Sequence, residues 1–201
     1  MMEALIISNI LSWIAVVALM LVTYALLRQV GLLHERMGPV GALTTASGVK
    51  PGEASPRFML PSLTGGSHTI GEPSVTGRST LLFFVSPDCP ICKELLPVIR
   101  AVRAREARWL DVVLASDGER DAQKAYILRQ GLDDFPYLLS ADLGQAFGVN
   151  KLPYAVLLDE NAIVVTHGLT NTREHIESLF EAKHRGVASI QDYLEKEQGA
   201  A

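Results

Sequence analysis

Cysteine is scarce in this sequence: the 201 residues include two, Cys89 and Cys92. So few cysteines exclude a secreted scaffold held together by several disulfides. A structural zinc site is not expected either, because no second Cys pair or closely spaced His pair completes a tetrahedral ligand set. Both cysteines lie in the stretch SPDCPICKELLP, and the chemistry of this pair is the main question that the sequence raises.

Basic residues are also few, with 18 Lys and Arg against 22 Asp and Glu and a formal net charge of −4. Aromatic residues make up 6% of the chain, and no stripe of basic residues interleaves with them. A nucleic-acid partner is therefore not expected. The sequence has no repeats at solenoid periods, so its length predicts one domain of ordinary size with an appendage.

Charge is missing altogether from residues 5–27, LIISNILSWIAVVALMLVTYALL. An apolar helix of this length spans the roughly 30 Å hydrocarbon core of a bilayer. A cleaved signal peptide would have a basic start, a shorter apolar core and a small-residue cleavage site. A core helix is the other alternative, but few helices of soluble proteins are apolar on every face. We therefore predict one uncleaved transmembrane helix within an N-terminal anchor of residues 1–30.

The composition changes after the anchor. Residues 31–51 are rich in Gly, Pro, Ser, Thr and Ala and predict a flexible tether, and one globular domain is expected over residues 52–201. Arg28 and Arg36 follow the span, and by the positive-inside rule they argue weakly for a cytoplasmic domain. A redox-active cysteine pair favours the opposite side of the membrane, so the sequence leaves the orientation open.

Apolar runs bounded by turn residues alternate with amphipathic stretches along the domain. STLLFFVS and WLDVVLAS, for example, are typical of strands buried on both faces. This alternation predicts a mixed α/β sheet with helices on both faces. Strands are expected at 57–60, 79–86, 109–116, 135–140, 154–159 and 163–168, and helices at 90–107, 121–130, 143–147 and 171–185. Gly131 is expected to end the second of these helices, and the spacing of Asn171 and Glu174 predicts a capping box at the start of the last.

Four interpretations compete for the Cys pair: a zinc site, an inert disulfide, buried thiols without a role, and a redox pair. An inert disulfide within one helical turn would remove little unfolded-state entropy. The motif follows a buried strand and opens a helix, with Pro90 suited to the first helical position. Free N–H groups and the helix dipole then favour a thiolate at Cys89, and Cys92 lies one turn further in. We predict that Cys89 is the nucleophile and Cys92 the resolving thiol, with no cofactor or metal besides their disulfide.

The strand–CxxC–helix arrangement, with Lys93 and Pro97 following it, resembles the thioredoxin fold. The later stretch KLPYAVLLDENAIVV is similar to the cis-proline segment of that family. The resemblance implies a cis bond between Leu152 and Pro153 that faces the Cys pair and lets a client backbone bind beside it. These two residues, and the dipeptide Pro90–Ile91 inside the motif, are then expected to bind the substrate.

The stretches RMGPVGAL, PGEASPRF and FFVSPDCPICKELLP extend the resemblance along nearly the whole chain, to the MauD family of membrane-anchored thioredoxin-like proteins. This resemblance implies a bacterial oxidoreductase anchored in the inner membrane through residues 5–27, with its domain in the periplasm. Its client would be the cysteine-rich small subunit of methylamine dehydrogenase, whose disulfides it would help to form or correct. A membrane thiol redox partner would reset the pair. A thiol reductase for cytochrome c biogenesis is the first alternative.

Two positions depart from the thioredoxin pattern. Asp88 stands where thioredoxin carries Trp, and its negative charge beside Cys89 opposes the helix dipole and modulates the thiol pKa. Phe83 stands where thioredoxin has a buried aspartate. Water or another acid must therefore handle the proton of Cys92.

Three other residues invite a functional interpretation. His167 lies about 75 residues beyond the Cys pair, and copper-delivery proteins of the same broad fold combine two cysteines with a distant His. A copper-binding chaperone is therefore the alternative of another class. Those proteins space their cysteines CxxxC, however, which favours an ordinary histidine at a strand end. Tyr137 and Tyr154 are expected either to line the groove beside Pro153 or to belong to the core or its rim.

Overall fold

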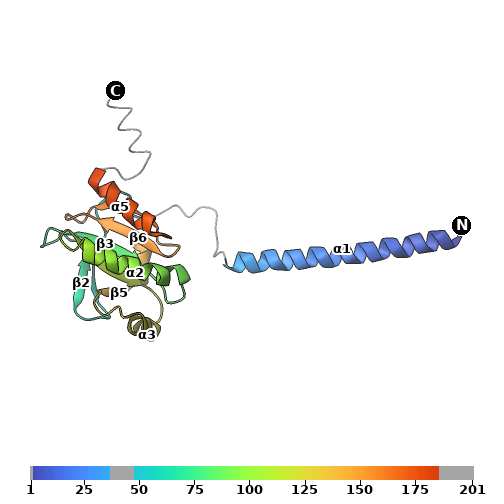
Figure 1. The fold of residues 1–201 in the computed structure, drawn as a ribbon, viewed down its shortest axis with the longest axis horizontal. Coiled ribbons are helices and arrows are strands. Elements are labelled where there is room, and N and C mark those ends of the chain that lie inside the picture. Colours follow the sequence, from blue (N-terminus) through green and yellow to red (C-terminus); the bar gives the residue numbers. More distant parts are fainter. Residues whose placement is uncertain (1, 37–47, 186–201) are drawn as a thin grey trace, which may run out of the picture. The chain divides into compact units, whose positions relative to one another are not determined.

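The computed structural model describes residues 2–36 and 48–185, which belong to two compact units, Met1–Thr45 and Ala46–Ala201 (Figure 1). The first unit contains helix α1 (Met2–Arg36). Its segment Ile6–Tyr24 has a mean hydropathy of 2.3 and is long and apolar enough to cross a membrane. The helix includes residues 31–36, the start of the expected tether, and residues 37–47 of that tether lie outside the described residues.

The second unit is built on a five-stranded mixed sheet. In sheet order the strands are β5 (Tyr137–Leu139), β4 (Leu110–Ser116), β3 (Ser79–Phe84), β6 (Tyr154–Leu158) and β7 (Val164–Leu169). The β3–β4 and β4–β5 pairs are parallel, whereas β6 runs antiparallel to β3 and β7 antiparallel to β6. The central strand β3 is apolar almost throughout, as expected of a strand that is covered on both faces.

Two hydrophobic cores form on the two faces of this sheet. One contains Leu81 and Phe83, and the other contains Leu82 and Phe84. Helices α2 (Pro90–Arg105), α3 (Arg120–Gln130) and α5 (Arg173–Arg185) contribute to the first, which we call the α2 core. Helix α4 (Ala141–Ala146) and a separate antiparallel hairpin, β1 (Phe58–Pro61) and β2 (Ser67–Ile70), contribute to the second, which we call the hairpin core. The predicted mixed sheet with covering elements on both faces is confirmed.

The helix ends follow local chemistry, with one correction. Helix α3 ends at Gly131, which adopts the left-handed conformation with φ 60°, as predicted for this position. The spacing of Asn171 and Glu174 suggested a capping box, but helix α5 begins at Arg173. The N–H of Asn171 instead donates to Nδ1 of His175 at 3.2 Å. The pattern therefore located the helix but not its cap.

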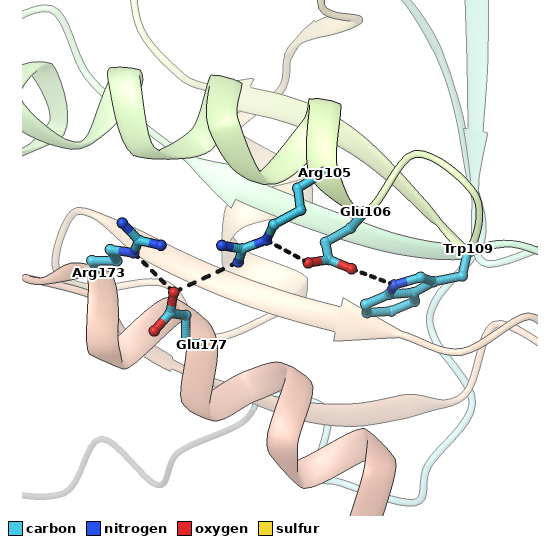
Figure 2. A network of polar contacts seen from close by, with 5 residues as sticks. All are labelled: Arg105, Glu106, Trp109, Arg173 and Glu177. Carbon is cyan, nitrogen blue, oxygen red and sulfur yellow. Dashed lines mark hydrogen bonds and ion pairs between the residues drawn. The ribbon is translucent and has the colours of Figure 1, made fainter.

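Figure 2 shows a polar network that joins the carboxyl end of α2 to α5. Arg105 Nε donates to one carboxylate oxygen of Glu106 at 2.8 Å, and Trp109 Nε1 donates to the other at 2.8 Å. On α5, Glu177 accepts from Arg173 at 2.8 Å and pairs with Arg105 at 3.6 Å. The network fixes α5 against the end of α2.

We expect Trp109→Ala to lower the free energy of unfolding by about 3 kcal/mol, because the indole also packs edge-on against the Phe180 ring, with centroids 5.4 Å apart. The control is Arg173→Ala, which removes only an exposed ion pair and should leave stability nearly unchanged. Urea unfolding of both variants, followed by circular dichroism, measures the difference. Equal losses would contradict a central role for Trp109.

Candidate active site

The two cysteines lie where the chain leaves β3 and enters α2. Cys89 is the N-cap residue of α2, and its Sγ accepts a hydrogen bond from the N–H of Cys92 at 3.1 Å. The two residues form a disulfide, with their Cα atoms 5.2 Å apart. Cys92 is fully buried and Cys89 is partly exposed. Solvent and a macromolecular substrate can therefore reach this pair through Cys89.

The amino end of α2 keeps its positive character. Its first turn contains no acidic residue, so nothing within the helix neutralises the free N–H groups and the dipole. Asp88 is exposed immediately before Cys89, and its own N–H donates to Ser86 Oγ at 3.3 Å. The Asp88 carboxylate thus opposes the helix in its effect on a Cys89 thiolate.

We expect Asp88→Asn to speed the alkylation of reduced Cys89 at neutral pH about two- to fivefold, because removal of a nearby negative charge favours the thiolate. Iodoacetamide labelling followed by mass spectrometry measures the rate. Asp121→Asn, in the first turn of α3, is the matched control and should react like the parent. An unchanged rate in Asp88→Asn would contradict this electrostatic effect.

The loop before β6 lies at the same end of the sheet. Tyr154 pairs with Phe84 in antiparallel register, so the preceding Leu152–Pro153 bond lies beside the end of β3. This bond is cis, which confirms the conformation that the resemblance implied. The buried Pro153 accepts a hydrogen bond from the N–H of Thr170 at 3.0 Å through its carbonyl oxygen. The β3–β6 pairing therefore places the proline loop beside the cysteine loop, and the Thr170 hydrogen bond ties it to the end of β7.

Apolar side chains are exposed at this end of the sheet. Ile91, in the first turn of α2, is 38% exposed, and Leu169, at the end of β7, is 40% exposed. Leu152 is partly buried and packs against both cores. Leu169 was missed in the sequence because a leucine at a strand end is unremarkable there. Its pairing with Tyr154 places it at the end of the sheet next to the proline loop, on the face that also carries Tyr154 and His167.

Hydroxyl groups and an amide form the buried polar cluster near the ends of β3 and β4. Ser116 Oγ donates to the carbonyl of Val85 at 2.8 Å, and the Tyr137 hydroxyl donates to Gln123 Oε1 at 2.7 Å. Burial raises the pKa of Tyr137, so the phenol stays neutral. Tyr137 therefore belongs to the core. An open pocket of about 210 Å³ lies here, and its lining includes Val85, Ser116 and Leu152.

His167 faces the side of the sheet away from Cys92. It pairs across the strands with Val156, which belongs to the hairpin core, whereas Cys92 belongs to the α2 core. Its Nδ1 shares a 2.6 Å hydrogen bond with the hydroxyl of Tyr154, whose ring stacks on the imidazole. Within the described part of the chain, no three His, Cys, Asp or Glu side chains form a potential metal site. The structure thus does not bring His167 to the cysteines as the copper alternative requires.

Burial lowers the pKa of His167 below its ordinary value of 6.5. The unfolded chain then binds a proton at His167 more readily than the folded chain does. The neutral, buried imidazole therefore contributes to stability above about pH 6.5, and this contribution is lost as the pH falls further. We expect the unfolding free energy of His167→Gln to decrease less than that of the parent between about pH 7.5 and about pH 5. Urea unfolding across this range tests the expectation. An equal pH dependence of the variant and the parent would contradict it.

Comparisons with known proteins agree with this geometry. The Redoxin family model matches residues 50–182. The methylamine utilization protein MauD of Methylorubrum extorquens is 46% identical over 193 residues, which cover 96% of this chain and 93% of that protein. The methylamine utilization protein MauD of Paracoccus denitrificans is 45% identical over 194 residues, covering 96% of each chain.

Solved structures show the same fold. The exposed lipoprotein thioredoxin of Streptococcus pneumoniae superposes with a TM-score of 0.56 at 18% identity, covering 63% of this chain and 99% of that one. A thiol:disulfide interchange protein of the thioredoxin family from Chlorobium tepidum gives a TM-score of 0.54 at 20% identity, covering 66% and 96%. The domain therefore has the thioredoxin-like fold that the CxxC and proline segments suggested.

Proposed function

This chain belongs to the Redoxin family and to the MauD family of methylamine-utilisation proteins, and from this membership we propose that Cys89 and Cys92 exchange disulfides with a cysteine-rich periplasmic client. The chain is a thioredoxin-like thiol–disulfide oxidoreductase. The observation that carries the proposal is the placement of the Cys pair. One cysteine is accessible and one buried, at the amino end of α2 and beside the Leu152–Pro153 loop.

In the reductive direction, the Cys89 thiolate attacks one sulfur of a client disulfide. An S–S bond forms between Cys89 and the client, and the other client sulfur leaves as a thiolate that takes a proton from water. Cys92 then loses its proton to water, and its sulfur attacks Sγ of Cys89 and releases the second client thiolate. The Cys89–Cys92 disulfide and a client dithiol result. Oxidation of a client follows the same steps in reverse. Isomerisation stops at the mixed disulfide, where a different client thiolate attacks the client sulfur bonded to Cys89, forms a new client disulfide and releases Cys89 as a thiolate.

The client segment binds across the exposed apolar side chains at this end of the sheet. Ile91 and Leu169 contribute exposed apolar surface, and Leu152 and Pro153 lie on the loop beside the disulfide. Pro90, exposed at the first position of α2, adds a rigid edge. Client selection at this surface rests on shape and apolar contact, because the helix dipole acts equally on any disulfide.

The client we favour is the small subunit of methylamine dehydrogenase, whose disulfides the protein would form or correct. Support comes from the relatives, whose name states a role in methylamine utilisation. We place α1 in the inner membrane and the domain in the periplasm, where disulfides persist. Arg28 and Arg36 oppose this orientation by the positive-inside rule, but they are only two charges. A membrane thiol protein would reset the Cys pair.

Trapping of the mixed disulfide tests the client. Full-length Cys92→Ala, expressed in a methylamine-grown host, cannot resolve its adduct and should retain the methylamine dehydrogenase small subunit until a reductant is added. The control variant carries Cys89→Ala as well and should retain nothing. Capture of apocytochromes c by the single variant would replace our client with that of the cytochrome c pathway. A C-terminal alkaline phosphatase fusion, active only in the periplasm, tests the orientation separately.

A further inference from the structure

The amino-terminal half of β4 has an open edge. β3 pairs with β4 along its length, from Leu110 to Ala115. β5 pairs with β4 only at residues 114–116. Within the described part of the chain, no strand pairs with residues 110–113 on the β5 side. An unpaired edge of this kind is a template for an additional strand.

Backbone groups of β4 point into this opening. Val85 N–H donates to the carbonyl of Ala115, so the odd-numbered residues of β4 face β3. Leu114 N–H donates to the carbonyl of Pro136, so the even-numbered residues face the β5 side. By the same alternation, the N–H and C=O of Val112 face the open edge, and neither has a hydrogen-bond partner among the described residues.

A groove of about 980 Å³ follows this edge. Residues 110–113 of β4 form its floor, and residues 68–70 of β2 form the wall on the hairpin side. The carboxyl half of α2 forms the opposite wall, because α2 covers the other face of the sheet. The loops that precede β3 and β5 close the two ends. We call this site the edge groove, and its two walls leave between them the position that a further strand would occupy.

Two arginines on the α2 wall carry charge that no carboxylate within the described residues neutralises. Arg103 lies over the ring of Phe135, with its guanidinium carbon 4.6 Å from the ring centroid. Arg100 donates to the carbonyl of Gln130 and lies 5.8 Å from the centroid of the same ring. Both guanidinium groups are thus held in place with donors available to an anion.

Most of the acidic charge in the edge groove is already paired. Asp111 binds Arg78 at 2.8 Å, and Glu72 pairs with Arg57. Asp134 is the remaining acidic residue of the lining. In addition, Nε of Arg78 is buried without a hydrogen-bond partner among the described residues. The groove therefore offers more free donors than acceptors, and it complements a negatively charged ligand.

We propose that the edge groove binds an extended acidic segment of a partner protein as an additional strand beside β4. The backbone of that segment pairs with the N–H and C=O of Val112, and its carboxylates reach Arg100 and Arg103. Arg103 lies eleven positions after Cys92 along α2, a rise of about 16.5 Å. A bound segment thus leaves the Cys pair accessible, and the site is independent of the thiol chemistry.

A designed peptide tests this site on the full chain in detergent micelles. The probe alternates valine and glutamate and is blocked at both ends. We expect saturable binding and about tenfold or greater slowing of hydrogen exchange at the Val112 amide. Arg103→Glu should weaken binding about tenfold, because an attractive charge contact becomes repulsive. Arg129→Glu, an exposed reversal on α3 away from the groove, should bind like the parent.

Two further measurements separate strand pairing from other modes of binding. A peptide with the same charges but N-methylated valines cannot complete the backbone pairing and should not bind. Equal binding of that peptide would overturn the proposal in favour of a simple anion site. Light scattering without peptide should give a monomer. A dimer that Arg103→Glu dissociates, or failure of the valine–glutamate peptide to bind, would also overturn it.

Discussion

Cys89→Ala is expected to abolish thiol–disulfide exchange, with a loss of roughly three orders of magnitude or more relative to the parent. Cys89 is the partly exposed member of the pair, and it lies at the N-cap, where the helix dipole and a Cys92 N–H at 3.1 Å stabilise negative charge on its sulfur. Cys92 is fully buried, so it has no direct access to a client disulfide. A fluorogenic glutathione disulfide, assayed with the full chain in micelles, measures the rate.

The matched variant is Cys92→Ala, which should still attack the substrate once. It should accumulate a mixed disulfide that mass spectrometry detects and that dithiothreitol releases, whereas Cys89→Ala should form no adduct. Substantial turnover by Cys89→Ala, or an adduct on Cys92 in that variant, would contradict the assignment of the nucleophile.

The second large effect is expected at Phe83, in the α2 core that also contains Cys92. Phe83→Asp should lower the free energy of unfolding by about 5 kcal/mol at neutral pH, because it removes a fully buried ring and buries a carboxylate. The apolar core raises the pKa of the introduced carboxyl, so the charge penalty should grow as the pH rises and shrink in acid. Urea unfolding at several pH values measures both effects.

Two controls separate packing from charge at this position. Phe83→Asn has nearly the same shape as the aspartate variant, and its loss of stability should not depend on pH. Phe83→Leu keeps an apolar side chain and should cost about 1 kcal/mol. Similar stability of the Asp variant and the parent at neutral pH would show that this position accepts a carboxylate. Packing of the α2 core would then not explain why this protein has no carboxylate near Cys92 at this position.

Several elements were predictable from the sequence because their signals are local. β3 and β4 are continuous apolar runs, and their predicted positions agree with the structure to within two residues at each end. Helix α3 ends at the predicted glycine. β2 was not predicted, because SHTI is short and mostly polar and forms a strand only through its pairing with β1. The predicted capping box of α5 was also wrong, because the spacing of Asn171 and Glu174 does not decide which backbone N–H groups their side chains bind.

The sequence by itself determined the apolar helix, the alternation of strands and helices, and the Cys pair at the start of a helix. These features depend on side chains within a few positions of one another, where the periods of strand and helix act directly. Only the tertiary structure placed His167 across the sheet from Cys92, brought Leu169 beside Tyr154, and left Val112 on an open edge. Each of these depends on the register and length of strands that are distant in the chain. A shift of one residue in pairing moves a side chain to the other face of the sheet, and a strand shortened to three residues exposes its neighbour's edge.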